Sequence, residues 1–397
     1  MTTTIPTPPT PDTPLLSLPM GAVLLAQFFS ALGDNALLIT AIALVKAEGH
    51  ADWIPLLQAA FVIPFIFLAP FVGALADAFP KGRVMLVANG LKLAAAGSLA
   101  AGAHPLLCYG LAGVGAAAYS PAKYGILSQL FGPEKLVKAN GMLEGSTIVA
   151  ILLGVLAGGW LADHSLGHAF AGVIGAYALA AAINLLIPRL PPEHPLARFA
   201  PGVLVAEFFV SVTTLWRNRD ARFSLMGTSL FWGTGSTLRL ALFAWVPVAL
   251  GILDNQTPAN LMGVVSIGIV IGAGLAGALV RLETVNRALL GGVLLGPLVV
   301  ALAWQETMVP AAVLLAAVGL AGGFFVVPLN ALLQERGHES VGAGHALAVQ
   351  NLWENLAMLS FVGLYALAEG LPVVGVITGF GGLVLAGVGL LAWSRMR

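Results

Sequence analysis

Long apolar segments alternate with short polar breaks along almost the whole chain. A helix needs about 20 mainly apolar residues to cross a membrane, and twelve segments come close to that length. We therefore predict an all-α polytopic membrane protein with twelve transmembrane helices. Their approximate bounds are 19–45, 53–77, 84–101, 104–131, 140–162, 168–188, 221–250, 259–280, 287–304, 309–334, 342–368 and 372–393.

The stretch from 189 to 220 does not follow this pattern. Its first part is rich in proline, which favours a stiff, non-helical linker. From Val203 to Trp216, apolar side chains recur at helical spacing, and Arg217 and Arg219 follow them. This arrangement is typical of an amphipathic helix that lies in the membrane interface. The alternative is that the stretch begins the seventh span.

These patterns divide the chain into four parts. The Thr- and Pro-rich segment 1–18 is predicted to be a disordered cytoplasmic tail, and 189–220 is predicted to be a cytoplasmic linker. An N-terminal six-helix half, 19–188, lies between them, and a C-terminal six-helix half, 221–397, follows the linker. The expected architecture is therefore six helices, a connection, and six helices.

The composition excludes several classes of protein. Charged residues make up 9% of the chain and hydrophobic residues 58%, whereas a soluble domain carries roughly 25% charged residues. The 18 basic and 18 acidic residues cancel, so no net positive charge attracts nucleic acid. A single cysteine, Cys108, excludes an internal disulfide. The sequence contains no nucleophile elbow, phosphate-binding loop or His-x4-Asp motif, so we expect neither an enzyme nor a cofactor.

The basic residues are distributed unevenly about the predicted spans. Of the 18, Lys92, Lys123 and Arg239 fall inside spans, and Lys46 lies at the far end of the first span. The remaining 14 fall on the side that both termini share. Because cytoplasmic loops are enriched in Lys and Arg, we expect both termini to be cytoplasmic.

Two short patterns recur, one copy in each half. Gly73–Arg83 ends the second span and Gly277–Arg287 ends the eighth, with ten residues from glycine to arginine in both. Gly115–Pro121 in the fourth span has a counterpart in Gly322–Pro328 of the tenth. The offsets are 204 and 207 residues, so we infer a duplicated six-helix unit. A parallel repeat of this kind is typical of major facilitator transporters, whose halves rock about a central site.

The segment Gly73–Arg83 resembles the loop signature that follows the second span in the major facilitator superfamily. Here the chain has an extra residue before the glycine–arginine pair, and alanine in place of the basic residue after Asp77. A carboxylate at this helix end is expected to bind Arg83 and the N-terminus of a helix in the other half. Asp77 and Arg83, with Arg281 and Arg287 in the equivalent loop, are therefore predicted to be gating residues.

Ionisable side chains inside spans are costly and usually functional. Asp34 and Gln27 share one face of the first span. Arg239, Trp232 and Ser236 share one face of the seventh. These two spans are the equivalent first helices of the two halves, so we expect Asp34 and Arg239 to face each other and to bind a charged substrate. The alternative is a structural ion pair that closes the cavity.

Spans 3, 4 and 5 carry further polar groups. Lys123 and Glu144 lie at similar depths on either side of a short turn and are expected to pair. The pair either binds substrate, together with Tyr119, or is structural. Lys92 in the third span either lines the substrate path or extends its ammonium to the cytoplasmic surface.

A polar cluster lies in the eleventh span. Gln350, Asn351 and Glu354 either line the cavity or join helices by hydrogen bonds. Asn330 and Gln334 in the tenth span are interpreted as packing or loop residues. The histidines lie at span ends and in loops without metal-ligand spacing, so no metal site is predicted.

Six strings, spread over essentially the whole chain, closely resemble the bacterial lysophospholipid transporter family. They are QFFSALGDNALL (27–38), KGRVMLVANGLKL (81–93), GVGAAAYSPAKYGIL (113–127), LVKANGMLEGSTIVAILLG (136–154), RFSLMGTSLFWG (222–233) and GGFFVVPLNALLQERG (322–337). The resemblance implies a major facilitator fold and movement of lysophosphatidylethanolamine and lysophosphatidylglycerol to the cytoplasmic leaflet of the inner membrane. It also implies coupling to an acyltransferase/acyl-acyl-carrier-protein synthetase that re-acylates them. We expect a monomer without a nucleic-acid partner.

The polar residues suit such a ligand. A phosphate favours Arg239, because a guanidinium binds phosphate in a bidentate way, with Lys123 or Lys92 as the cation further in. An ammonium group favours Asp34, and a single acyl chain needs an apolar lining. The alternative function is a proton-coupled antiporter or symporter for a small amphipathic solute or drug, in which Asp34, Glu144 or Glu354 titrates.

Overall fold

The structure is a computed structural model that describes residues 14–50, 53–193, 200–253, 256–368 and 370–396, and these residues are all-α. The first seven helices are α1 (Leu18–Ala47), α2 (Ile54–Phe67), α3 (Ala69–Ala78), α4 (Lys81–Ala100), α5 (Pro105–Leu130), α6 (Pro133–His164) and α7 (Leu166–Asn184). The others are α8 (Pro201–Arg217), α9 (Arg219–Leu250), α10 (Gln256–Leu279), the 3₁₀ turn η2 (Leu282–Arg287), α11 (Ala288–Ala303), α12 (Met308–His338), α13 (Ala343–Leu367) and α14 (Val373–Met396). Most of the predicted tail, residues 1–13, lies outside the described residues.

Eight of the described helices are long and apolar enough to cross a membrane, and a ninth span results if α2 and α3 count as one. These two helices meet at an angle of 62°. Pro64 inside α2 and Pro70 at the start of α3 remove backbone donors near the bend, which is a common cause of a kink. The other predicted spans are α4, α5 and α13, which contain Lys92, Lys123 and Glu354 and pack within the same bundles as the apolar helices.

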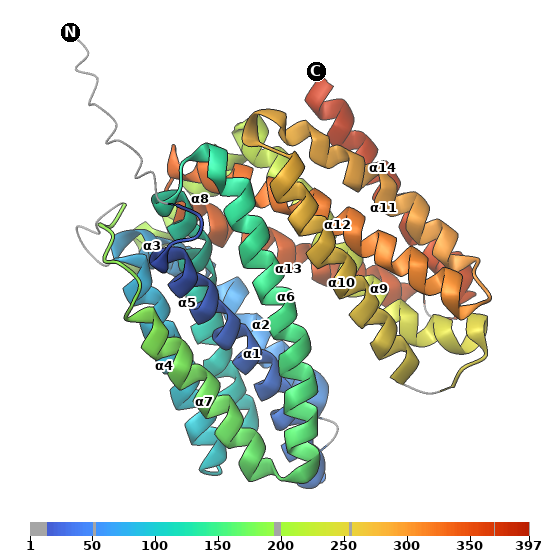
Figure 1. Ribbon diagram of the computed structural model, residues 1–397, viewed down its shortest axis with the longest axis horizontal. Coiled ribbons are helices and arrows are strands. Elements are labelled where there is room, and N and C mark those ends of the chain that lie inside the picture. The colour runs from blue at the N-terminus through green and yellow to red at the C-terminus, as the bar shows by residue number, and fades with distance from the viewer. Residues whose placement is uncertain (1–13, 51–52, 194–199, 254–255, 369, 397) are drawn as a thin grey trace.

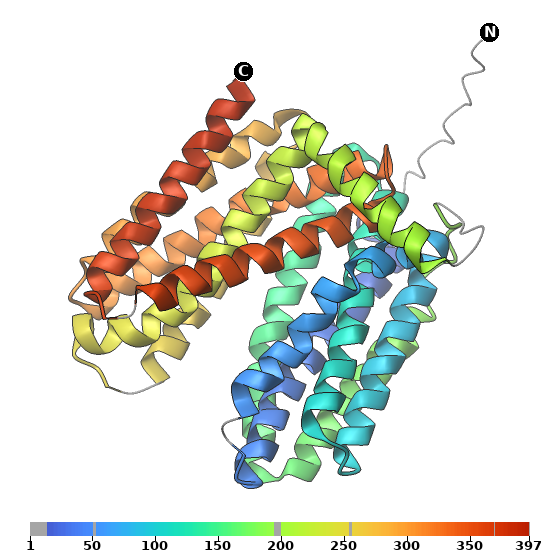
Figure 2. The same ribbon diagram turned by 180° about the vertical axis from the view of Figure 1, so that it is seen from behind.

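The helices form two bundles that meet at one end of the molecule and diverge toward the other (Figures 1 and 2). Helices α1 to α7 make one bundle and α9 to α14 make the other. Helix α1 begins where the bundles meet, and α14 ends on the same side of the molecule but away from the contact; we call this side the terminal end. The arrangement is the predicted one of two six-helix halves.

Contacts between the bundles involve α3, α5 and α6 of one half and α10, α12 and α13 of the other, and we call them the terminal interface. Glycine residues allow the helices of this interface to approach each other closely. A Cβ on Gly141 of α6 would lie 2.8 Å from the Ala273 carbonyl oxygen of α10. A Cβ on Gly344 of α13 would lie 2.7 Å from the Gly73 carbonyl oxygen of α3. Because backbone meets backbone here, the halves are in close contact at this end.

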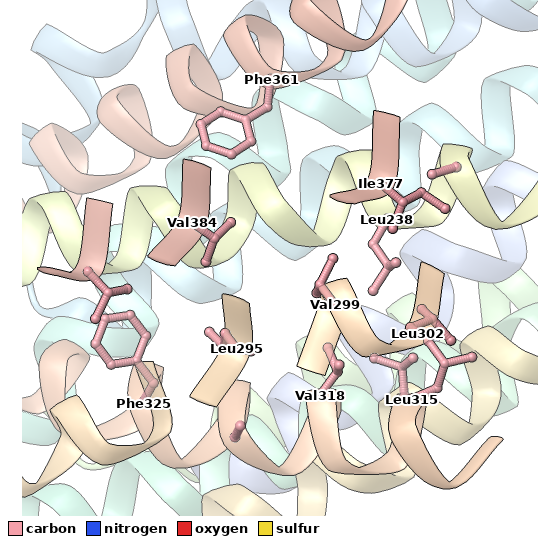
Figure 3. Close-up of a cluster of buried hydrophobic side chains, with 14 of the residues drawn as sticks. Leu238, Leu295, Val299, Leu302, Leu315, Val318, Phe325, Phe361, Ile377 and Val384 are labelled. Carbon is pink, nitrogen blue, oxygen red and sulfur yellow. The ribbon is translucent and has the colours of Figure 1, made fainter. Parts of the chain in front are cut away.

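Aliphatic and aromatic side chains hold the C-terminal bundle together. Leu238 of α9, Val299 of α11, Val318 of α12, Phe361 of α13 and Val384 of α14 belong to one cluster (Figure 3). All five side chains are buried. Since close packing of this kind resists deformation, we expect this half to move as a rigid body.

The linker helix α8 is a separate element from α9. The chain turns at Asn218, whose side chain accepts hydrogen bonds from the backbone N–H groups of Asp220 and Ala221 and so caps α9. Helix α8 buries Phe208 against α3 and α13 and leaves Phe209 exposed. The alternative in which this stretch begins the seventh span is therefore wrong. Its placement in the membrane interface stays a prediction.

Candidate functional site

A buried ion pair lies in the N-terminal half. Lys92 Nζ of α4 is 2.7 Å from Asp34 Oδ2 of α1, and Lys92 is 1% exposed. Tyr177 of α7 donates its hydroxyl to the other Asp34 oxygen at 2.8 Å, and Lys92 also donates to Ser30. The Asp34 side chain nevertheless stays 20% exposed. The carboxylate is thus fixed by neighbouring helices of its own half while part of it remains open to a ligand.

Of the other predicted site residues, Tyr119 contacts this pair and Gln27 lies two helical turns before Asp34 on α1. The Tyr119 ring centre lies 5.0 Å from Lys92 Nζ, within the range of a cation–π contact. Gln27 lies on the same face of α1 as Asp34, and its side-chain amide donates to the Thr147 hydroxyl of α6 at 3.0 Å. The first span therefore carries a continuous polar face inside the N-terminal bundle.

The predicted pair of Asp34 and Arg239 is not formed. Asp34 pairs with Lys92 instead, and Arg239 is an exposed residue of α9 without an ion-pair partner among the residues that the structure describes. The reason is geometric. The two residues belong to different bundles, and these diverge away from the terminal end, so an equivalent position along the chain does not imply contact (Figure 2).

Arg239 shares its side of α9 with Trp232 and Ser236. Trp232 is 37% exposed, and Ser236 donates its hydroxyl to the Gly233 carbonyl one turn earlier. The opposite side of the helix is buried in the C-terminal bundle. Because an arginine that faces lipid in the middle of a bilayer is very costly, this side of α9 is expected to face water or a ligand. It offers a cation with an aromatic neighbour.

Lys123 and Glu144 do not make the predicted direct ion pair. Tyr124 lies between them, because its hydroxyl donates to Glu144 Oε1 and its ring centre is 4.5 Å from Lys123 Nζ. Both charged side chains are buried. Lys123 is still close enough to Glu144, Asp34 and Glu354 to interact with them electrostatically. Lys123, Tyr124 and Glu144 therefore form one polar cluster, in which the tyrosine separates the expected ion-pair partners.

A chain of hydrogen bonds connects this cluster to the other half. Asn330 of α12 donates to Glu144 Oε1 of α6 at 3.3 Å. Gln350 of α13 donates to Asn330 Oδ1 and to Glu354 Oε1, both at 2.7 Å. The polar cluster of the eleventh span thus joins helices by hydrogen bonds, and it connects two buried carboxylates from different halves.

Two further pairs cross the terminal interface. Asn140 and Gln334 exchange two hydrogen bonds of 2.9 and 2.7 Å, and both side chains are buried. Asn351 donates to Ser120 at 3.1 Å. Of the two interpretations of Asn330 and Gln334, the packing one is therefore right, because both are buried and their hydrogen bonds join neighbouring helices. Polar side chains in an apolar helix were the available signal, but the sequence does not show which side of α12 faces the other half.

Asp77 at the end of α3 lies against the start of α13, a helix of the other half. Its carboxylate accepts hydrogen bonds from the backbone N–H groups of Gly344 at 2.7 Å and His345 at 2.9 Å. His345 Nδ1 and Lys81 Nζ lie 2.7 and 3.0 Å from the same carboxylate. The free N–H groups and the positive end of the helix dipole both favour an anion at this position. A gating role for Asp77 stays a prediction.

The expected contact between Asp77 and Arg83 is absent. Arg83 is exposed, and Lys81, four residues after Asp77, is the cation that binds the carboxylate. Arg281 and Arg287 are also exposed. The hydrogen bonds that the structure describes for these two arginines stay within their own half, around the turn η2. The geometry therefore gives no direct support for the three arginines as gating residues.

Comparisons with known proteins agree with this fold. The family model described as Major Facilitator Superfamily matches residues 23–362. The lysophospholipid transporter LplT of Serratia proteamaculans (strain 568) is 58% identical over 364 residues, which cover 91% of each chain. The protein of the same name from Citrobacter koseri is 55% identical over 390 residues, which cover 97% of this chain and 98% of that one.

Solved structures with the same fold are more distant in sequence. The human organic anion transporter MFSD10 (TETRAN) has a TM-score of 0.78 at 17% identity and covers 97% of this chain and 100% of its own. The fucose:proton symporter FucP of E. coli, solved as the N162A variant, has a TM-score of 0.73 at 13% identity, with 96% and 98% covered. A bacterial homologue of the iron transporter ferroportin, in an outward-facing state, has a TM-score of 0.73 at 17% identity, with 96% and 99% covered. These likenesses concern the fold alone.

Proposed function

The chain belongs to the lysophospholipid transporter family of the Major Facilitator Superfamily, and we propose that it moves lysophospholipids across a bacterial inner membrane. The observation that carries the proposal is the identity of 55–58% over most of the chain with proteins named for that activity. The intramembrane charges fit such a ligand. A lysophosphatidylethanolamine head group combines a phosphate with an ammonium group, and the site contains both cations and carboxylates.

In the proposed mechanism the head group binds between the halves. Arg239 binds the phosphate, because its guanidinium is accessible and has no competing carboxylate among the described residues. Asp34 binds the ammonium group through the part of its carboxylate that Lys92 and Tyr177 leave exposed. A head group that contacts both residues brings the two bundles together at the end where they now diverge. This difference in contacts between the two states is what drives a conformational change.

The side on which the bundles diverge supports the proposed direction of transport. The bundles meet at the terminal end and diverge at the other (Figure 1). The 14 basic residues predicted to be cytoplasmic are expected on the same side of the membrane as both chain termini. We therefore assign the terminal end to the cytoplasm and the present conformation to an outward-open state. Lysophosphatidylethanolamine and lysophosphatidylglycerol then enter from the outer side and are delivered to the cytoplasmic leaflet, where an acyltransferase/acyl-acyl-carrier-protein synthetase re-acylates them.

The test is import of labelled lysophosphatidylethanolamine into proteoliposomes, with and without ion gradients. Arg239→Ala and Asp34→Asn are expected to reduce import at least tenfold, because each removes a charged hydrogen bond to the head group. Arg222→Ala is the matched control, since Arg222 lies on the same helix at the terminal end and donates to the Trp216 carbonyl. Import by folded Arg239→Ala protein at the rate of the control would refute the proposed head-group site.

A proton-coupled carrier of amphipathic solutes is the second candidate. The observation that favours it is the hydrogen-bond chain between two buried carboxylates, Glu144 and Glu354, through Asn330 and Gln350. Intramembrane carboxylates of this kind form proton relays in many transporters. Solute uptake that an uncoupler abolishes and that lysophospholipid does not compete with would favour this function over the first.

A further inference from the structure

The first part of the connection between the bundles, from Ile187 to Glu193, packs on the N-terminal half. Ile187 packs closely on Gly82 of α4, because a Cβ added to Gly82 would lie 2.9 Å from Ile187 Cγ2. Gln129 of α5 donates to the Pro191 carbonyl at 3.2 Å. Three prolines lie between Ile187 and Glu193, and each fixes one backbone dihedral angle. The backbone that carries Glu193 is therefore stiff and belongs structurally to the N-terminal half.

The Glu193 side chain reaches the C-terminal half. Its Oε2 accepts a hydrogen bond of 3.0 Å from the backbone N–H of Ala343, the first residue of α13. Its Oε1 lies 3.3 Å from Lys81 Nζ of α4 and 3.3 Å from His338 Nδ1 at the end of α12. The side chain is only 7% exposed. One carboxylate from the linker thus contacts groups from both halves in the terminal interface.

Glu193 and Asp77 share the start of α13 between them. Glu193 accepts from Ala343, while Asp77 accepts from Gly344 and His345. The first four N–H groups of a helix have no partner within the helix, and two carboxylates satisfy three of them here. Lys81 contacts both carboxylates and offsets their mutual repulsion. All of these bonds require that α13 stays against the N-terminal half.

We propose that Glu193 is a second carboxylate that holds the terminal end closed, so that the linker takes a direct part in the conformational change. The proposal rests on the alternating access described under the proposed function. When α13 moves away from α3, the Ala343 N–H group leaves a carboxylate whose backbone cannot follow. The buried Glu193 charge then loses a hydrogen bond, and this loss favours the closed state until water reaches the group.

A cysteine in the terminal interface measures opening directly. Ala276 of α10 is 0% exposed and belongs to the cluster that joins the two halves there. In a Cys108→Ala, Ala276→Cys background, the rate of reaction with a water-soluble maleimide reports how often the terminal end opens. Glu193→Gln keeps the size of the side chain and removes its charge. We expect it to raise the reaction rate about tenfold, the factor that corresponds to one charged hydrogen bond.

The matched control is Glu339→Gln. Glu339 lies at the same end, is half-exposed, and pairs with Arg336 of its own half, so its replacement should leave the rate unchanged. Asp77→Asn should raise the rate, and Glu193→Asp, which keeps the charge, should give a rate between those of the parent and Glu193→Gln. A Glu193→Gln rate equal to the control rate, with Asp77→Asn fast, overturns the proposal. Because no lysophospholipid is added, this outcome does not depend on the substrate, whereas loss of the proposed function would appear only in the import assay.

Discussion

Gly344 is the position at which one methyl group is expected to separate the two halves at the terminal end. A Cβ there would lie 2.6 Å from Asp77 Oδ1 and 2.7 Å from the Gly73 carbonyl oxygen, whereas ordinary contact begins at 3.4 Å. The Gly73 oxygen belongs to the backbone and cannot rotate away. In Gly344→Ala the start of α13 must therefore shift away from α3, and the 2.7 Å hydrogen bond from the Gly344 N–H to Asp77 lengthens.

Two effects set the magnitude of this change. Overpacking of a tight contact costs about 1–3 kcal/mol. Weakening a hydrogen bond to a charged acceptor costs up to about 1.5–3 kcal/mol. The preference of alanine over glycine for a helix does not enter, because α13 is helical in both conformations. The closed state is therefore expected to lose about 2–4 kcal/mol, which corresponds to a shift of at least roughly 30-fold toward the state that is open at the terminal end.

The assay is again maleimide labelling of Ala276→Cys in the Cys108→Ala background. Gly363→Ala is the matched control, because Gly363 lies on the same helix and an added Cβ would meet no heavy atom within 4 Å. We expect Gly344→Ala to be labelled at least roughly 30-fold faster than this control, because the labelling rate follows the open population. Equal rates for the two variants would show that the contact between α3 and α13 does not keep the terminal end closed, and would refute the reasoning.

Three further predictions concern stability. Asn218→Ala removes the cap of α9 and is expected to cost about 1 kcal/mol, seen as a lower Tm in detergent. Asn140→Leu leaves the buried Gln334 amide without its two bonds and should cost about 1–3 kcal/mol, whereas the double variant with Gln334→Leu should recover much of that loss. Burial raises the pKa of Glu193, but the nearby His338 imidazole and the charge of Lys81 outweigh this and hold the pKa below its ordinary value of 4.5. The stability that Glu193 contributes is therefore present in full above pH 4.5 and is lost as the pH falls through the lowered pKa, so the difference in Tm between the parent and Glu193→Gln should shrink only in acid.

The helical architecture could be predicted from the sequence because the signal is local. A run of about 20 apolar residues ends at a polar or proline-marked break. The start of α12 and both ends of α14 therefore lie within a few residues of their predicted bounds. The bend at Leu68 was not predicted, because Pro64 and Pro70 lie inside one continuous apolar run. Helix–helix contacts are less local, and periodicity alone does not fix them.

The partners of the charged residues were harder to predict. Equal depth in equivalent helices suggested that Asp34 meets Arg239, but the lateral distance depends on the angle between the bundles. The nearest cation to Asp34 is Lys92 of its own half. Similarly, Arg83 fits the family signature in sequence, yet Lys81 is the residue that follows Asp77 by one helical turn and binds it. Spacing identifies which residues are polar, and packing decides which of them meet.

An ion pair within one half and an amide pair between the halves respond differently when the halves separate. The buried ion pair of Asp34 with Lys92 lies inside one half, whereas the buried bonds between Asn140 and Gln334 join uncharged amides of different halves. When the halves separate, amides exchange each other for water at little net cost, but a severed ion pair would leave two charges to be resolvated. The charged contacts that do cross between the halves, from Asp77 and Glu193 to the start of α13, are therefore the costly ones to break when the terminal end opens.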